Sequence, residues 1–174
     1  MVVQISLTLV STVTVGSGGA ASIEFTNIPQ TGKDLLVLIS GRSARAGEFG
    51  RADNYLIQLN NDTANNYTYR RLIGNGSTAS SGSGTVNGFL NTLPASLATA
   101  NTFGNTSLYI ANYTSSVAKS TSLDGVDESN ATAAYAELYA QTWSGTSAVT
   151  SIKILTLNNQ NLVQHSSASL YIIS

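Results

Sequence analysis

The side chains that could perform catalysis in this sequence are few and widely separated. His165 is the only histidine in the 174 residues. Histidine-based metal clusters are therefore excluded, and a Ser-His-Asp triad would have to use this one imidazole. The Gly-x-Ser-x-Gly turn that presents a nucleophilic serine does not occur in the sequence. We interpret His165 as a polar residue of a hairpin, next to Ser166 and Ser167.

Carboxylates offer a second kind of chemistry, the binding of calcium. The segment LDGVDES contains Asp124, Asp127 and Glu128, and carboxylate oxygens are among the ligands that calcium prefers. Their spacing does not match the D-x-D-x-D-G loop, and a hard cation needs six or more oxygen ligands. A solvated turn is the favoured interpretation, and we expect the chain to need no metal and no cofactor.

Hydrolysis of a glycoside would need a pair of carboxyl groups beside the scissile bond. The glutamates of this chain are scattered, although folding could unite two of them: Glu24, Glu48 and Glu137. The glycine-rich stretch GNGSTASSGSG is neither the dinucleotide-binding pattern nor a P-loop, because no Lys-Ser/Thr pair and no helix follow it. Since no set of residues fits nucleophilic, metal or phosphate chemistry, we predict that the protein is not an enzyme.

Arg70 and Arg71 lie in a strand-like segment directly before this glycine-rich stretch. Adjacent residues of a strand point to opposite faces. One arginine is therefore expected to face solvent and the other an ion pair or an interface, with Asp53 or Asp62 as candidate partners. Residues 75–84 are expected to form an exposed loop that tolerates shortening, because loop length costs little free energy.

Further candidate contacts border a second loop, residues 44–52, and occupy the segment AYAELYAQTWS. The arginines beside the loop could meet an acidic partner surface. Exposed tyrosine and tryptophan rings would suit stacking on sugars, although packing in the core or at an interface is the favoured use of such residues in sheets. The candidate interface or ligand contacts are the following side chains: Arg42, Arg45, Arg51, Arg70, Arg71, Tyr135, Tyr139 and Trp143.

The composition is that of a neutral β protein coated with hydroxyl and amide groups. Charged residues make up 10% of the chain and hydrophobic residues 42%, whereas about 25% of an average globular sequence is charged. The net charge of -1 argues against broad attraction to nucleic acid. No apolar run approaches the length that spans a bilayer, and Met1 leads into VVQISLTLV without a basic region, so we expect no signal peptide.

Alternating polar and apolar residues predict strands along most of the chain. The first segment alternates from Val3 to Val15, and the apolar run at residues 35–39 predicts a central strand covered on both faces. AYAELYAQTWS has a face of small residues opposite a tyrosine and tryptophan face, which favours a strand packed closely against another sheet, with a helix as the alternative. With eight to ten such strands, the sequence predicts an all-β fold. We expect residues 1–174 to form one antiparallel, jelly-roll-like β-sandwich domain.

Three stretches of the chain resemble known proteins: SIEFTNIPQTGKDLLVLISGRS, YTYRRLIGNGS and TSIKILTLNNQNLVQHSSASLYII. They resemble small virion structural proteins of tailed bacteriophages, of the decoration (cement), head-fibre or tail-fibre type. The resemblance covers most of the chain and rests on patterns of strands and turns. It implies a β-sandwich on the outer surface of a virion, often trimeric, and it carries no catalytic residues.

The first function that we expect from this resemblance is that of a capsid decoration or cement subunit. Such a subunit would be assembled in the host cytoplasm, self-associate as a homotrimer and bind the major capsid protein or another virion protein. Residues 1–15 are expected at the subunit interface, because Val2 and Val10 interrupt the polar face of the first strand. The lack of a coiled-coil or collagen-like shaft favours decoration over the alternative, the receptor-binding head of a tail or head fibre or spike that recognises host surface glycans. A free lectin-like domain is a third interpretation.

Overall fold

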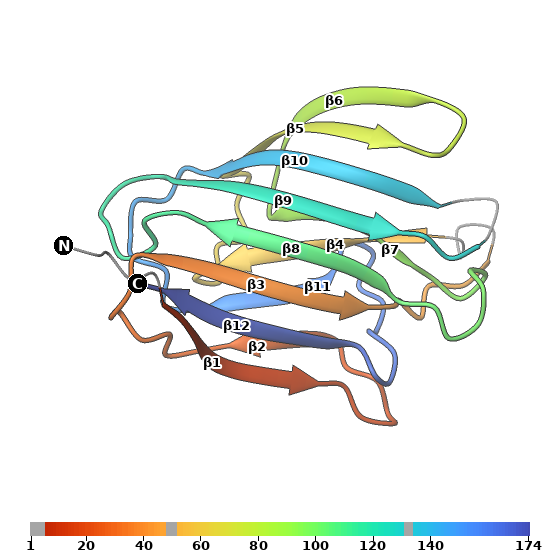
Figure 1. The fold of residues 1–174 in the computed structure, drawn as a ribbon, viewed down its shortest axis with the longest axis horizontal. Helices are drawn as coiled ribbons and strands as arrows, with labels where there is room; N and C mark the ends of the chain where they lie inside the picture. Colours follow the sequence, from red (N-terminus) through yellow and green to blue (C-terminus); the bar gives the residue numbers. More distant parts are fainter. Residues whose placement is uncertain (1–5, 48–51, 131–133) are drawn as a thin grey trace.

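The computed structural model describes residues 6–47, 52–130 and 134–174 of the chain (Figure 1). In this part of the chain, two antiparallel sheets pack on each other and no α-helix is present. This confirms the predicted all-β antiparallel sandwich. The strands are β1 (Leu7–Thr14), β2 (Ser22–Phe25), β3 (Asp34–Gly41), β4 (Ala52–Leu59), β5 (Tyr67–Gly74), β6 (Ala79–Val86), β7 (Phe89–Pro94), β8 (Gly104–Ile110), β9 (Lys119–Asp127), β10 (Tyr135–Trp143), β11 (Ile152–Thr156) and β12 (Ser167–Ile173).

Eight of these strands are connected as a jelly roll. Half of the large sheet has the order β1-β12-β3-β8, and the small sheet has the order β2-β11-β4-β7. The antiparallel pairs are nested along the chain: β1 with β12, β2 with β11, β3 with β8 and β4 with β7. A double sheet of eight strands with this connectivity is a jelly roll, and the predicted topology is the observed one.

Two insertions raise the number of described strands to twelve, so the prediction of eight to ten was too low. The hairpin β5–β6 is inserted between β4 and β7, and the pair β9–β10 between β8 and β11. Both join the large sheet, which continues from β8 as β9-β10-β5-β6. In Figure 1 these four strands occupy the upper half of the sheet, with β6 at its edge.

The β6 strand corrects the expectation that residues 75–84 form a loop. Its backbone pairs with β5 from Tyr67–Val86 to Gly74–Ala79, and backbone pairing needs no apolar side chain. The glycines serve packing instead. Gly84 lies opposite Tyr69, and a Cβ atom on Gly84 would lie 2.9 Å from Cε1 of that ring. Small residues on β6 therefore leave room for the large side chains of β5.

Deleting residues 77–82 is consequently expected to lower the free energy of unfolding by about 2 kcal/mol, because it removes ladder hydrogen bonds between β5 and β6 and the glycine opposite Arg71. In a chain of this length the melting temperature should fall by roughly 6 °C. The control replaces both Ser81 and Ser83, whose side chains are exposed, by alanine, and should change stability by less than about 0.5 kcal/mol. An unchanged melting temperature of the deletion variant would contradict a stabilising role for β6.

The core lies between the two sheets and follows the alternation of the strands. In β3, the side chains of Leu35, Val37 and Ile39 are buried against the small sheet, whereas that of Leu38 is 40% exposed. The prediction that this strand is covered on both faces was therefore wrong, because no second layer covers the outward face of the large sheet within the described chain. β10 is a strand, as predicted, and not a helix.

Candidate functional site

The most distinctive surface of the chain is the outward face of β9, β10, β5 and β6, which we call the outer face. Alternation in β10 turns Glu137, Tyr139 and Gln141 inward, where they are buried, and leaves Leu138 and Ala140 exposed. The same alternation operates in β9, where every second residue is buried. The outer face therefore consists mainly of serine, alanine and a few apolar side chains.

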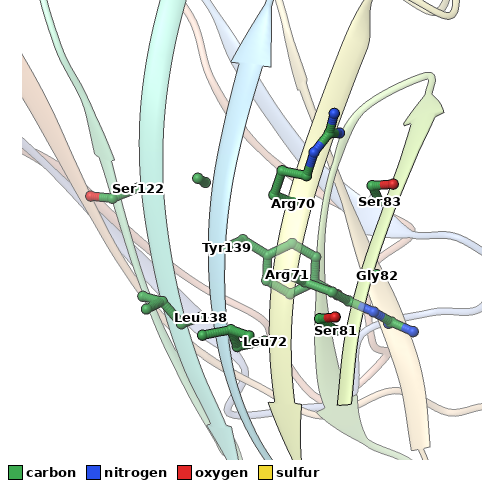
Figure 2. Close-up of a pocket in the computed structure, with 10 residues that line it drawn as sticks. Arg70, Arg71, Leu72, Ser81, Gly82, Ser83, Ser122, Leu138 and Tyr139 are labelled. Atoms are coloured by element: carbon green, nitrogen blue, oxygen red, sulfur yellow. The ribbon is translucent and has the colours of Figure 1, made fainter.

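Two leucines form a ridge across the outer face. In the strand register, Leu138 of β10 lies between Asp124 of β9 and Leu72 of β5. The side chains of Leu72 and Leu138 are 59% and 53% exposed, and Figure 2 shows them next to each other. Large exposed apolar side chains that are adjacent differ from the single ones common on any surface, and they mark a candidate contact.

The ridge separates two open hollows of about 700 Å³ and about 390 Å³. Each hollow exists because its floor carries small side chains. The floor and rim of the larger one include Arg70, Ser81, Ser83, Ser122 and Ala140. Those of the smaller one include Gly74, Ala79, Asp124, Val126 and Ala136.

Arg70 and Arg71 point to opposite faces, as predicted from their adjacency. Arg70 is exposed on the outer face, where its Nη1 donates to the carbonyl of Tyr69 at 3.0 Å. Arg71 lies on the inward face, and its Nη1 donates to Oη of Tyr139 at 3.4 Å. This hydroxyl contact, ahead of smaller electrostatic effects, raises the pKa of Arg71. The predicted partners of these arginines have other contacts: Asp53 lies beside Arg45, and Asp62 accepts a hydrogen bond from Trp143.

Behind the outer face, a chain of buried polar groups joins the two sheets. Oε2 of Glu137 accepts hydrogen bonds from Nδ2 of Asn91 at 2.8 Å and from the backbone N–H of Thr92 at 2.7 Å. Thr106 donates to Oδ1 of Asn91 at 2.6 Å. Burial first, and the neighbouring Glu137 second, raise the pKa of Tyr139 to about 12. Buried polar groups with partners fix the position of one sheet on the other.

Asp127 ends β9 on the inward face and is buried. Among the described residues, neither of its carboxylate oxygens has a hydrogen-bond partner, and the same holds for Tyr55 Oη and Ser129 Oγ. Burial, with the nearby Glu137 carboxyl group as the next cause, raises the pKa of Asp127 to about 7.

The alternation also separates the carboxylates that we weighed as calcium ligands. Asp124 is exposed on the outer face, whereas Asp127 is buried on the opposite side of the same strand, and Glu128 is exposed beyond its end. The described residues contain no group of three or more His, Cys, Asp or Glu side chains that could hold a metal ion.

The arginines beside the second loop have structural contacts. Arg42 is buried and donates to the carbonyls of Thr99 at 2.8 Å and Ala98 at 3.0 Å, so it holds the segment between β7 and β8. Burial lowers the pKa of Arg42. Nη1 of Arg45 lies 3.7 Å from the buried carboxylate of Asp53. Arg51, the third candidate, is outside the described residues.

Two of the three candidate aromatic residues lie in the core. Trp143 is 3% exposed, donates from Nε1 to Asp62 at 2.7 Å and stacks on Tyr67. Tyr139 is 1% exposed. Both are therefore core residues and cannot stack on a sugar at the surface. Tyr135 is half-buried beside a further hollow that includes Glu128.

The structure decides which face of the AYAELYAQTWS segment is covered. The small face points outward, and the tyrosine and tryptophan face packs inward. Leu72 and Leu138 were not among the predicted contacts, although Leu72 shares its parity with Arg70. The signal that could have found them is the combination of a leucine with alanine, serine and glycine neighbours on one face.

His165 lies in a turn, with a positive φ of 74° and its backbone N–H bonded to the carbonyl of Val15 at 3.0 Å. His165 is a turn residue, but the strands before and after it, β11 and β12, lie in different sheets. The interpretation of His165 as a residue of a hairpin was therefore wrong. No helix in the described residues has the length and apolar character needed to cross a membrane.

Comparisons with known proteins add little. No family model and no curated protein matches the chain. Among solved structures, the chain is similar to the crystal structure of Scytalido-glutamic peptidase with a peptide-based transition state analog. That similarity has 11% sequence identity and a TM-score of 0.28, and covers 88% of this chain and 63% of the peptidase chain. It carries no argument about activity, and the resemblance to virion proteins stays a prediction.

Proposed function

We propose that the chain is a non-enzymatic structural protein of a bacteriophage virion, a decoration or cement subunit that acts through self-association and through contacts with the major capsid protein. The observation that carries this proposal is the large sheet, whose outward side is broad and nearly free of charge. The charged side chains on this side, within the described strands, are Asp34, Arg70 and Asp124. Asp34 is already bonded to Tyr109 Oη at 2.7 Å. A surface of this kind suits protein contacts.

The edge strand β1 supports the part of the proposal that concerns a homotrimer. Leu7 and Leu9 are 55% and 54% exposed, and among the described strands β1 is paired with β12 alone. An unprotected edge with exposed leucines is a template for contacts between chains. We propose that β1 contributes to a closed ring of subunits, with three-fold symmetry as the resemblance implies.

The alternative, a fibre or spike head that binds host glycans, has less support. Its two best candidate residues for stacking, Tyr139 and Trp143, are buried. Tyr135 is the candidate that keeps some exposure. A free lectin-like domain has the same weakness.

The proposed location is tested by immunogold labelling of purified phage particles with antibodies raised against the folded chain. We expect regular labelling of the capsid surface. Labelling confined to a tail tip or a fibre would favour the receptor-binding alternative, and particles without label would refute the virion role. The trimer is tested by light scattering on the purified protein and on a variant with both Leu7→Ser and Leu9→Ser, which should lose the trimer if β1 makes the contact.

A further inference from the structure

The outer face combines an apolar ridge with two opposite charges in a symmetric arrangement. Leu138 and Ala140 occupy successive outward positions of β10. Leu138 is paired with Asp124 on β9, and Ala140 is paired with Arg70 on β5. Arg70 and Asp124 are therefore diagonal to each other, on the two sides of β10.

The register gives the dimensions of this arrangement. Arg70 and Asp124 are two strand spacings apart, or about 10 Å, and two residues apart along the strands, or about 7 Å. Their Cα atoms are consequently about 12 Å from each other, and the midpoint lies on β10 between Leu138 and Ala140. A two-fold axis through this midpoint, in the plane of contact and perpendicular to the line that joins Arg70 to Asp124, exchanges the two positions. It places Arg70 of one copy over Asp124 of the other, twice.

We propose that the outer face is a contact between two copies of this chain, related by this two-fold axis. The partner is a second copy because the surface is complementary to itself in charge: Arg70 and Asp124 are the charged side chains of the outer face, and both are exposed. The ridge of Leu72 and Leu138 then lies at the centre of the contact, with the hollows beside it available to the leucines of the partner. Isologous interfaces have this self-complementary character.

The size of the outer face predicts a weak contact. Four strands spaced by about 4.8 Å, with about seven residues of about 3.4 Å each, cover about 450 Å² per copy. The total of about 900 Å² is below the range of stable interfaces and typical of transient ones. Such a contact gains strength when subunits are already arrayed, because each further contact then forms at a high effective concentration.

The pairing rests on the proposed self-association but not on the location in a virion. It leaves the edge of β1 available for a different contact.

Charge reversal tests the pairing, because only this geometry predicts that two weakened variants regain association when they are mixed. In a homodimer, Arg70→Glu places a carboxylate opposite Asp124 twice, and Asp124→Lys places an ammonium group opposite Arg70 twice. Each variant alone should therefore associate about tenfold more weakly than the natural chain. In an equimolar mixture, a heterodimer has two opposite-charge contacts. The mixture should thus recover association close to that of the natural chain, and so should the chain that carries both substitutions.

The measurement is sedimentation velocity over a concentration series. It reports a reversible doubling in the mass of the smallest species, whether that species is a monomer or a trimer. Lys33→Glu, which changes the same charge at an exposed position before β3, is the control and should have no effect. A variant with both Leu72→Ser and Leu138→Ser should lose the doubling altogether. Absence of doubling in the natural chain, or reversal variants that are not rescued by mixing, would overturn the proposal. Either result leaves the virion location to be decided by the labelling experiment.

Discussion

At pH 8, replacing Asp127 by asparagine is expected to raise the free energy of unfolding by up to about 4 kcal/mol. The carboxyl group is buried without a hydrogen-bond partner among the described residues, and its pKa is raised from 3.8 to about 7. Folding therefore favours the protonated acid. The stabilisation is complete below the unfolded pKa near 4 and is lost as the pH rises through about 7. Asparagine stays neutral throughout and avoids this loss.

The measurement is chemical denaturation of both proteins from pH 4 to pH 8. The stability of the natural chain, relative to that of the Asp127→Asn variant, should decline across this range and level off above pH 7. Ser120→Ala is the matched control, because Ser120 is on the same strand but exposed and has no titratable side chain, and it should not change the dependence on pH. If the free energies of unfolding of the two proteins differ by the same amount at pH 4 and at pH 8, that result would contradict a raised pKa for Asp127.

Asn91→Ala is expected to lower the free energy of unfolding by about 3 kcal/mol, because it removes one partner from two buried groups. Asn91 is 0% exposed and connects Glu137 of the large sheet to Thr106. Gly125→Ala should have a comparable effect by a different route, since a Cβ atom on Gly125 would be 2.0 Å from Oδ1 of Asn91. The asparagine would have to move away from both of its partners.

A double-mutant cycle separates this mechanism from two independent losses. Once Asn91 is alanine, the added methyl group at residue 125 has no oxygen to displace. The chain with both substitutions should be about as stable as Asn91→Ala alone. Urea denaturation of the natural chain, the two single variants and the double variant measures the coupling energy. Ser122→Ala, at an exposed position of β9, is the control and should change the free energy of unfolding by nearly zero. Additive effects of the two substitutions would show that Gly125 is required for a reason unrelated to Asn91.

Period-two alternation was sufficient to predict most of the strands and the class of the fold, because a strand with one covered face must alternate to bury that face. It failed at β6. The sequence ASSGSGTV contains no apolar alternation, since an edge strand outside the span of the small sheet has little to bury. Its pairing comes from backbone hydrogen bonds and from glycines that accommodate Tyr69 and Arg71.

By itself, the sequence determined the antiparallel all-β sandwich, the separation of Arg70 from Arg71 and the strand at Tyr135–Trp143. Only the tertiary structure decided which side of each strand is covered. Alternation indicates that the two faces of a strand differ in polarity. The face that becomes buried depends on the order of strands in the sheet and on where the second sheet ends. That order placed Trp143 in the core, Leu138 at the surface, and Asp124 and Asp127 on opposite sides of one strand. Burial of a polar or apolar group is a property of its neighbours in space, and those neighbours come from strands that lie far apart in the sequence.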